Sequence, residues 1–482
     1  MSESVASPTP PMRRPRRFWR WVKRGTLALA LLITVAPLVG FGEMKWTRRS
    51  GQKKLDAATA KLDADDPGWR LEDIVAEHNS KVPPAESNSA LKAVAIVGRL
   101  PKTDDPEQSP WKLRKRIDTA RSQNERPDPR DWSALEKHYP AWEPGMIELR
   151  QWTAATPRGR FKFEYAGGSP LDIRIQNSHD VRTALSVLSW DSLHHAYGGR
   201  ADRALASALS GLHLTRSVDF EPIFFAYLVR LRCVIQVMNS VAQTLAWCPN
   251  AADAALAPLQ DSMLFESTSA PVRPSLRGER AYMLKSMVMA DRDEISIYDD
   301  RSHGTRRERL QHQYHRQFLP NQAAFALERF DELSALLVLP DPEKTTAFQQ
   351  WTLPLRNREN FLGVTLLRPV VSVVATAEIR HRARCLCTAA GIACERYRLK
   401  HGKWPAKLDD LTEFGMPQNL LDPFDGQPLR YSLLDDGAVV YSVDEDGRDD
   451  GGEVVRREGR PKDVGFRLWN PDRRKVPMPA RP

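Results

Sequence analysis

A glycine-rich acidic run near the C-terminus contains the residue types of this sequence that most clearly suggest a binding site. Residues 444–452 read Asp-Glu-Asp-Gly-Arg-Asp-Asp-Gly-Gly. Clustered carboxylates repel one another unless a cation offsets their charge. Ca²⁺ takes six to eight oxygen ligands, and glycines let backbone carbonyls turn toward an ion. The composition of the run is therefore compatible with a bound cation such as Ca²⁺, and a solvated acidic turn without an ion is the alternative.

The spacing of this run is not that of an EF-hand. An EF-hand loop carries a bidentate glutamate at its twelfth position. The twelfth residue counted from Asp444 is Val455. Any calcium site here must therefore combine the loop with other parts of the chain.

The other residues with catalytic potential form no known signature. The sequence contains no G-x-S-x-G, no H-E-x-x-H and no glycine-rich phosphate loop. His312 and His315 have a spacing that can present two metal ligands on a helix, but their segment is dense in arginine, which repels a cation. We interpret the scattered Asp and Glu residues of the body as surface charge and expect no enzyme. The alternative is an extracytoplasmic hydrolase whose helical cleft gathers His194, His195 or the acids of 172–221.

The elements around the acidic run predict a small α+β unit. A long helical pattern covers residues 369–400, followed by a glycine that favours a helix end. Residues 429–434 and 438–443 alternate between apolar and polar types around an Asp-Asp-Gly turn, which is the pattern of a β-hairpin. Residues 464–468 can return as a further strand.

Residues 394–470 resemble the globular domain of type II secretion major pseudopilins. The matching residues are Tyr397-Arg398-Leu399, Gly402-Lys403-Trp404-Pro405, Asp422-Pro423-Phe424-Asp425-Gly426-Gln427-Pro428 with Tyr431, Tyr441-Ser442-Val443 leading into Asp446-Gly447, and Asp463-Val464 before Trp469. The resemblance implies a calcium ion in the loop after the hairpin, held by Asp446, Asp463 and the Val443 carbonyl. Asp449 and Asp450 are further candidate ligands in the same loop.

The N-terminal part of the chain departs from the pseudopilin pattern. In that family the processing site precedes the apolar helix, and the helix runs directly into the globular domain. Here the apolar run ends more than 350 residues upstream, and Gly42-Glu43 follows it. We therefore expect a pseudopilin-like domain at the end of a helical body, not a filament subunit.

The N-terminal region predicts a membrane anchor over residues 25–42. Its uncharged stretch reaches roughly 25 Å as a helix, near the short limit for crossing a bilayer. Residues 1–54 hold twelve Lys or Arg and two acids, so they carry +10, the whole net charge of the chain. Seven basic residues precede the run and five follow it, which places the N-terminus in the cytoplasm. A cleaved signal peptide is the alternative, but no A-x-A pattern closes the run.

The remaining sequence predicts a helical body. Apolar residues recur at helical spacing through residues 181–245, and the turn at Gly198-Gly199 weakly resembles a tetratricopeptide hairpin without a second copy in register. The five cysteines fit small apolar side chains in packed helices. The predicted units are a disordered basic tail (1–24), a transmembrane helix (25–42), a helical and loop-rich membrane-proximal region (43–165), a helical body (166–365), and a long helix with the β domain (366–482).

These observations predict a mainly α, single-pass protein of the inner membrane with an extracytoplasmic body. Its expected role is a scaffold or interaction module, and the resemblance implies a link to secretion. The expected partners are membrane lipid and an unidentified protein. The neutral body does not favour nucleic acid, because the basic excess lies at the membrane flanks. The expected cofactor is structural Ca²⁺.

Overall fold

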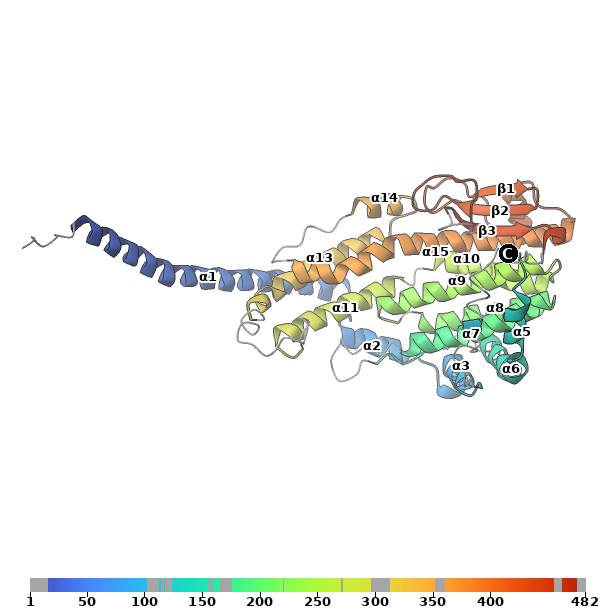
Figure 1. Ribbon diagram of the computed structural model, residues 1–482, viewed down its shortest axis with the longest axis horizontal. Coiled ribbons are helices and arrows are strands. Elements are labelled where there is room, and N and C mark those ends of the chain that lie inside the picture. Colours follow the sequence, from blue (N-terminus) through green and yellow to red (C-terminus); the bar gives the residue numbers. More distant parts are fainter. Residues whose placement is uncertain are drawn as a thin grey trace, which may run out of the picture.

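The computed structural model describes residues 16–101, 112–113, 117, 124–155, 159–164, 176–219, 221–269, 272–295, 313–351, 360–454 and 462–474. These parts of the chain are mainly helical, with one small antiparallel sheet near the C-terminus. Long helices run along one axis, α1 extends from one end, and the sheet lies against α15 toward the other (Figure 1). The predicted mainly α class with a small C-terminal sheet is confirmed.

The elements have the following bounds. The helices are α1 (Arg16–Asp65), α2 (Leu71–Ser80), α3 (Ser89–Gly98), α5 (Pro129–Glu136), α6 (Tyr139–Ala155), α7 (Gln176–Tyr197), α8 (Ala201–Thr215), α9 (Phe224–Trp247), α10 (Asp253–Thr268), α11 (Val272–Asp291), α13 (Leu319–Leu336), α14 (Glu343–Gln350) and α15 (Phe361–His401). The short 3₁₀ segments are η1 (Ala85–Ser87), η4 (Arg216–Val218), η6 (Leu408–Phe414) and η7 (Pro471–Arg473). The strands are β1 (Arg430–Leu434), β2 (Gly437–Ser442) and β3 (Val464–Trp469).

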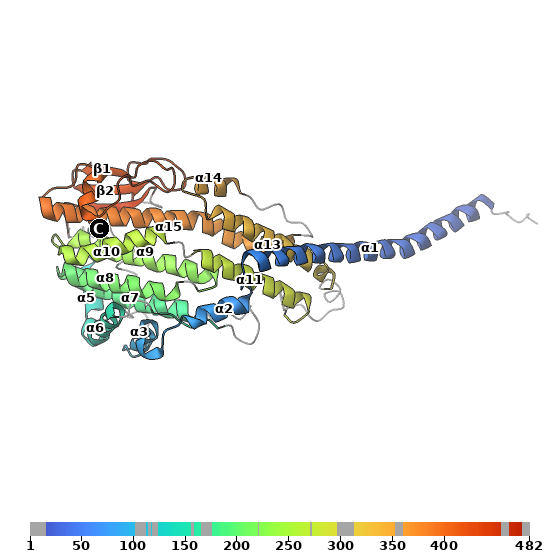
Figure 2. The same cartoon turned by 180° about the vertical axis from the view of Figure 1, so that it is seen from behind.

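Helix α1 is fifty residues long and joins the N-terminal segment to the body. The pattern of residues 50–66, which ends at Asp66-Pro67-Gly68, predicts a separate short helix, but the structure makes residues 50–65 the last part of α1. Its C-terminal part lies beside α13 in both views (Figures 1 and 2). Leu55 and Leu62 are buried there, and Gly51 lies so close to Asn321 that an added Cβ would meet the Asn321 nitrogen at 2.7 Å. Most side chains of the predicted membrane segment lie outside the described residues.

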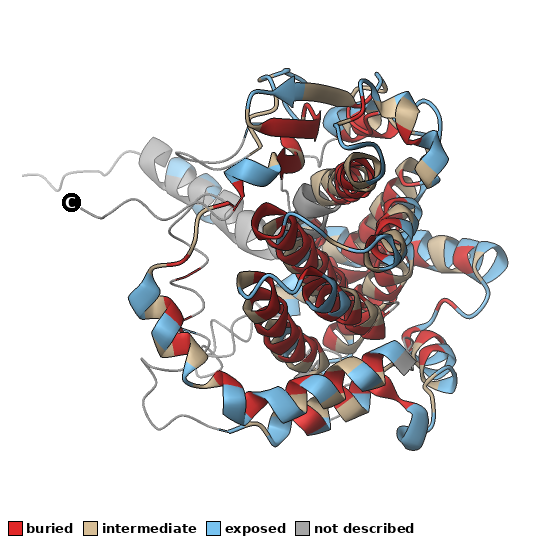
Figure 3. Cartoon of the chain, turned by 90° about the vertical axis from the view of Figure 1, so that its right-hand side faces the viewer, coloured by how far each residue is buried: buried red, intermediate tan, exposed pale blue. Residues whose placement is uncertain are grey.

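Helices α7, α8 and α9 form the centre of the body. The predicted turn after Tyr197 is confirmed, and Gly199 adopts a positive φ of 74° that suits glycine. Gly211 of α8 lies against Leu185 of α7, where an added Cβ would meet the leucine side chain at 2.7 Å. Figure 3 shows buried residues concentrated on these central helices, with exposed residues on the outer ones. Close helix contact therefore gives the body its core.

Among the helices whose side chains are described, α9 is the one that is long and apolar enough to cross a bilayer; most of the apolar run of α1 lies outside that set. However, 61% of its most apolar window is buried inside the body. It also carries Arg230, whose side chain is 1% exposed and paired with acids. These features are those of a core helix in a folded body.

The C-terminal sheet packs on α15 and shares its core with the helical body. The strands are antiparallel in the order β1-β2-β3, with Leu434 opposite Gly437 and Val440 opposite Phe466. The Phe466 ring fills the space beside Gly391 of α15, where an added Cβ would meet it at 2.3 Å. One hydrophobic cluster continues from the body helices into β2 and β3. The sheet is thus part of the same packed unit.

Residues 161–165 alternate between apolar and polar types, a pattern that predicts a short strand, but the described residues of this stretch, 161–164, form no strand. Side chains, and not a partner strand, form hydrogen bonds with this extended backbone. Asn79 accepts from the Phe163 N–H at 2.8 Å and donates to the Phe163 carbonyl at 3.0 Å. Asn88 donates to the Arg160 carbonyl at 2.6 Å. Burial of Phe161 and Phe163 explains the alternating pattern that suggested a strand.

Candidate functional site

The first two acids of the C-terminal run bind the long helix. Arg380 of α15 donates to Asp444 Oδ1 at 2.8 Å and lies 3.4 Å from Glu445 Oε1. Asp444 adopts a positive φ of 59°, which turns the chain immediately after β2. This ion pair attaches the start of the loop to the helix beneath the sheet.

Two of the predicted ligands take part in local turn contacts. The Asp446 carboxylate accepts a hydrogen bond from the Arg448 N–H at 3.1 Å and lies on the exposed side of the loop. Val443 is buried at the end of the sheet, and its N–H donates to Asp422 at 3.0 Å. The buried Asp422 thus organises the base of this turn.

The other three predicted ligands, Asp449, Asp450 and Asp463, lie in the same part of the loop region, where Asp449 and Asp450 act on Asp463. Asp463 Oδ2 accepts from the Gly452 N–H at 2.8 Å, whereas Asp463 Oδ1 is buried without a hydrogen-bond partner among the described residues. Asp449 Oδ1 accepts from the Tyr441 hydroxyl at 3.0 Å. Burial raises the pKa of Asp463, backbone hydrogen bonds from Gly452 and Asp450 oppose this rise, and the nearby carboxylates of Asp450 and Asp449 add to it. An ionised Asp463 would therefore gain from a cation beside its open oxygen.

This arrangement fits a calcium ion in part. The open oxygen of Asp463 and the glycines of the loop favour one. Against it, the Lys462 ammonium already lies 3.7 Å from Asp450 Oδ1 and 3.1 Å from Glu453 Oε2. Within the described residues, no group of three or more His, Cys, Asp or Glu side chains is placed to hold a metal. The calcium site stays a prediction, with Val443, Asp446, Asp449, Asp450 and Asp463 as its candidate ligands.

A second polar cluster, which the sequence did not reveal, surrounds Arg230 inside the body. Arg230 bonds to Asp219 and, at 2.5 Å, to Glu266 of α10. Arg216 donates to the other Glu266 oxygen at 3.0 Å. Burial opposes ionisation of Glu266, but the guanidinium groups of Arg230 and Arg216 hold its pKa below the usual value. We call these four residues the Arg230 network; it contains two cations and two carboxylates.

Helix α15 adds further polar groups beside this network. The Tyr227 hydroxyl donates to Glu378 Oε2 at 2.5 Å, and burial raises the pKa of Glu378. His381 Nε2 lies 3.6 Å from Cys385 Sγ. Burial and the charge of Arg230 lower the pKa of His381 to about 3, so its imidazole is neutral at pH 7. Burial raises the pKa of the Cys385 thiol, which makes it a poor nucleophile.

A third cluster gathers the two histidines of α7. His194 Nδ1 lies 2.6 Å from Glu136 Oε2, and its ring stacks on Tyr139 with centroids 3.4 Å apart. Arg200 approaches both imidazoles, at 2.7 Å from His194 Nε2 and 3.0 Å from His195 Nδ1. Burial, together with nearby arginines, lowers the pKa of His195 to about 4. Both rings are therefore used in binding neighbouring side chains.

This third cluster contains a serine, a histidine and an aspartate, but their contacts are not those of a nucleophilic triad. In a triad the hydroxyl bonds to the imidazole, which removes its proton. Here the Ser207 hydroxyl donates to Asp191 Oδ2, while Tyr139 donates to Asp191 Oδ1 at 2.9 Å. Asp191 is fully buried and His195 is 2% exposed. The cluster joins α6, α7 and α8, and the hydrolase alternative stays a prediction.

The interpretation of the body acids as surface charge is wrong for three of them. Within the described residues of 166–365, the buried acids are Asp191, Glu221 and Glu266. One signal could have indicated a polar interior: Arg230 follows Tyr227 by three positions and precedes Val234 by four, so it lies in the apolar stripe of α9. The acidic partners lie on other elements, and local spacing cannot show them.

Comparisons with known proteins identify no relative. No family model matches the chain, and neither the curated proteins nor the solved structures contain a match. The pseudopilin and tetratricopeptide resemblances stay predictions from the residues quoted above. Function is therefore argued from the geometry of this chain alone.

Proposed function

We propose that this protein is a single-pass, membrane-anchored scaffold whose rigid body presents an interaction surface away from the bilayer. The observation that carries this proposal is the continuity of α1, which contains the basic and apolar N-terminal segment and is built into the body. The excess of basic residues before the apolar run supports a cytoplasmic N-terminus and an extracytoplasmic body at the inner membrane.

Ion pairs and apolar contacts attach α1 to the body along one face. The Arg48 guanidinium donates to both Asp291 oxygens of α11 at 2.8 Å. Lys61 binds Asp331 of α13 at 2.9 Å. Exposed pairs of this kind stabilise by roughly 0.2–1 kcal/mol each. Burial of Leu55 and other apolar side chains supplies most of the attachment.

The end of α1 is also held in place. Arg277 of α11 donates to both Asp66 oxygens, at 2.9 and 3.1 Å, and to the Gly68 carbonyl at 3.0 Å. Arg280 binds the same carboxylate. The turn that leads to α2 is therefore fixed on α11, and the anchor meets the body without a flexible joint.

The length of α15 determines how far the body extends. Its 41 residues span about 62 Å at the usual rise per residue. The sheet lies at the end of the body remote from the projecting part of α1 (Figure 1). We assign the protein-binding surface to this remote end, and the resemblance of residues 394–470 supports a link to secretion.

A structural calcium ion is the second part of this proposal. The open buried oxygen of Asp463 supports it, with Asp449 and Asp450 as neighbouring ligands. A bound ion would offset the repulsion among these carboxylates and connect the loop to the start of β3.

Membrane fractionation of the full chain tests the anchor. The chain should remain in the membrane pellet after an alkaline carbonate wash, and a protease added on the extracytoplasmic side should digest the body. Lysine at both Leu31 and Val35 should release the chain, because charge within the bilayer is costly. Release of the wild-type chain by carbonate would contradict the anchor.

Energy transfer to lipid tests the rigid attachment. All five native cysteines are buried, so a dye on Leu421→Cys, whose side chain is 51% exposed, labels the remote end selectively. Transfer to headgroup acceptors should be weak. A flexible Gly-Ser insertion after Met44 should strengthen it, because the body could then approach the bilayer. Equal transfer in both chains would contradict a rigid scaffold.

A further inference from the structure

Three arginines on neighbouring helices have no hydrogen-bond or ion-pair partner among the described residues. They are Arg182 of α7 and Arg232 of α9, which are exposed, and Arg384 of α15, which is half-buried. Burial and the charges of Arg380 and Arg232 lower the pKa of Arg384, and the Asp444 carboxylate opposes this shift. Removing a cation from water without a partner is costly. Arg384 is therefore held where an unbound guanidinium is unfavourable.

Two hydrogen bonds show that α9 and α15 run in the same direction. Toward the beginning of α9, the Tyr227 hydroxyl donates to Glu378 Oε2 at 2.5 Å. Just after the end of α9, the Pro249 carbonyl accepts from the Arg398 guanidinium at 2.6 Å. In both views α9 extends along α15, on the side of α15 that faces α7 (Figures 1 and 2).

Arg232 and Arg384 emerge on the same side of this helix pair. Arg232 follows Tyr227 by five residues. Arg384 follows Glu378 by six, so the two arginines lie at nearly the same height. Each residue turns an α-helix by about 100°, which places Arg232 about 140° round α9 from Tyr227. The same turn places Arg384 about 120° round α15 from Glu378 in the opposite sense. Because Tyr227 and Glu378 face each other, both rotations bring the arginines to one side.

Arg182 adds a third guanidinium beside Arg232. The Gln236 amide of α9 donates to Ser189 Oγ of α7 at 3.0 Å, which fixes how these two helices lie against each other. Arg182 precedes Ser189 by seven residues, or about two turns, so its side chain also faces α9. The charges of Arg182 and Arg232 both oppose the rise that burial causes in the pKa of Cys233. Three helices therefore bring three cations to one part of the body.

The acids near these arginines do not balance them. Asp444 and Glu445 lie beside α15, but Arg380 donates to Asp444 at 2.8 Å and lies 3.4 Å from Glu445. Asp180 precedes Arg182 by two positions, and side chains two apart on a helix do not face each other. Among the described residues, the three arginines and Arg380 thus meet two carboxylates, which leaves a net positive charge.

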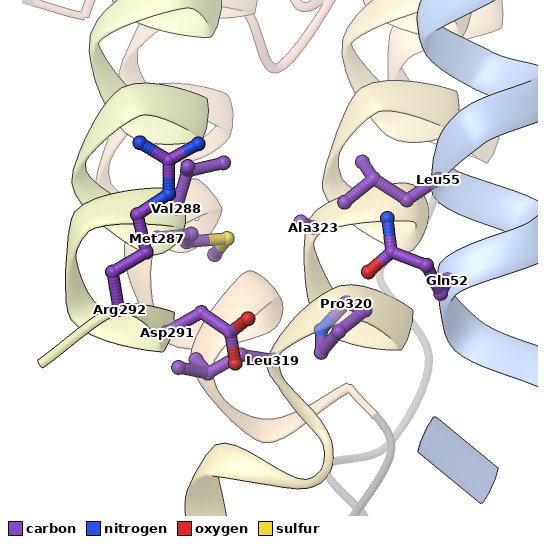
Figure 4. Close-up of a pocket in the computed structure, with 9 residues that line it drawn as sticks. All are labelled: Gln52, Leu55, Met287, Val288, Asp291, Arg292, Leu319, Pro320 and Ala323. Carbon is purple, nitrogen blue, oxygen red and sulfur yellow. The ribbon is translucent and has the colours of Figure 1, made fainter. Parts of the chain in front are cut away.

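The arginines around the cavity between α1, α11 and α13 differ in this respect (Figure 4). Arg48 donates to both oxygens of Asp291 at 2.8 Å. Arg292 lies 3.9 Å from Glu294. Both of these cations have an acid beside them. The unpaired arginines are therefore a local property of α7, α9 and α15, and do not simply reflect the many arginines of the chain.

We propose that Arg232 and Arg384 bind a soluble, multivalent oxyanion of the phosphate or pyrophosphate type, with Arg182 at the edge of the site. A guanidinium can donate two parallel hydrogen bonds to such an anion. The anion supplies the partner that Arg384 lacks and offsets the repulsion among the arginines. Arg384 lies 23 residues after the start of α15, or about 35 Å along it. The ligand therefore comes from solution, and the site does not depend on the proposed anchor.

Titration calorimetry of the full chain in phosphatidylcholine nanodiscs, with pyrophosphate at constant ionic strength, tests the site. The buffer contains no calcium, which pyrophosphate would chelate. Saturable binding is expected. Arg384→Gln and Arg232→Gln should each weaken it about tenfold, because each removes a hydrogen-bonding partner that carries charge. The matched control, Arg130→Gln, removes an exposed cation from α5 and should leave the affinity unchanged.

Thermal unfolding separates a binding role of Arg384 from a structural one. Without ligand, Arg384→Gln should unfold at the same temperature as the wild type or higher, because it removes a half-buried cation that has no partner. Pyrophosphate should raise the midpoint of the wild type by a few degrees and leave that of the variant unchanged. Arg232 is exposed, so Arg232→Gln provides the same comparison if Arg384→Gln does not fold.

Three results would overturn the proposal. The first is the absence of saturable pyrophosphate binding by the wild type. The second is wild-type affinity in folded variants that lack Arg232 or Arg384. The third is an equal loss of affinity in Arg130→Gln, which would show that the anion responds only to the overall charge of the chain.

Discussion

The acidic loop and the Arg230 network place charge in opposite surroundings. The loop concentrates acids within nine consecutive residues, and Asp446 and Asp449 lie near solvent. The Arg230 network draws its charges from α9, α10 and the segment between α8 and α9, and Arg230 is 1% exposed. Charge density along the sequence therefore does not indicate where charge matters most for stability.

The physical reason is the cost of removing charge from water. Replacing a neighbour of a solvated carboxylate changes the free energy of unfolding little, because the solvent screens the charge. A buried ion depends on its partners, and removal of one partner leaves an uncompensated charge in the interior. The two regions should therefore respond very differently to equivalent substitutions.

Loss of Arg230 is expected to have the largest effect. Arg230→Met leaves Asp219 and Glu266 buried with one arginine fewer, and should lower the free energy of unfolding by about 3–5 kcal/mol. Denaturant midpoints of the full chain measure this. The matched control is Arg448→Met in the acidic loop, which should change stability by no more than about 0.5 kcal/mol. An equal loss of stability in the two variants would contradict the expected difference between the buried network and the exposed loop.

Glu221 should make stability depend on pH. Burial raises the pKa of Glu221 from 4.5 to about 7. The folded chain then holds a proton that the unfolded chain has released, so this contribution is full below about pH 4.5 and is lost as pH rises through about 7. Glu221→Gln stays neutral and should be more stable than the wild type at pH 8, by up to about 3 kcal/mol.

Denaturant midpoints at pH 4 and pH 8 measure this difference. The variant should lose less stability than the wild type between the two values. A matched change in the loop, Glu445→Gln, replaces a side chain that is 53% exposed and should not alter the difference. An identical pH response in the wild type and Glu221→Gln would show that Glu221 is not the titrating group.

Calcium should stabilise the loop by a smaller amount. A ligand that binds only the folded state adds about 2.7 kcal/mol at one hundred times its dissociation constant. Thermal unfolding should therefore shift upward by a few degrees in calcium relative to excess chelator. Asp463→Asn should remove the shift, and Lys462→Gln should enlarge it by removing the ammonium that competes for Asp450. Coincident curves for the wild type would eliminate the calcium site.

Asp446→Asn should have the smallest effect. Its carboxylate lies on the exposed turn and bonds only to the nearby Arg448 N–H. We expect a stability change within about 0.5 kcal/mol without calcium, and a calcium shift that is reduced but not abolished. A complete loss of the shift, equal to that of Asp463→Asn, would place Asp446 among the central ligands and would bring the loop closer to the pseudopilin pattern.

Much of the local structure could be predicted because its signals are local. The hairpin of β1 and β2 follows from alternation around Gly437, which adopts a φ of 153°. The end of α15 follows from Gly402, whose φ of 72° suits a helix C-terminus. The predicted start of that helix at residue 369 was eight residues late, because apolar periodicity alone does not mark a helix beginning without a cap.

For the candidate metal site, the sequence predicted the types of residue but not their arrangement in space. Five ligands were predicted, and Asp449 and Asp450 lie near enough to Asp463 to raise its pKa, but the described residues contain no group of three acids placed to hold a metal. The Asp446 carboxylate accepts from the Arg448 N–H, whereas the Val443 N–H, not its predicted carbonyl ligand, donates to Asp422. Whether the predicted ligands come close together depends on how the loop folds back on the strand. Sequence spacing does not show which side chains of the loop bind other protein groups.

The sequence by itself determined the helical class, the hairpin, the burial of the cysteines and the uneven placement of basic charge. These properties depend on periodicity, turn residues and composition, which act over a few neighbouring positions. Only the tertiary structure decided which charges are buried. Arg474 meets Glu395 at 2.8 and 2.9 Å across 79 positions, and Arg48 meets Asp291 across 243. Such pairs form because packing brings distant segments together and excludes water, so each partner stabilises a charge that would otherwise be too costly to bury.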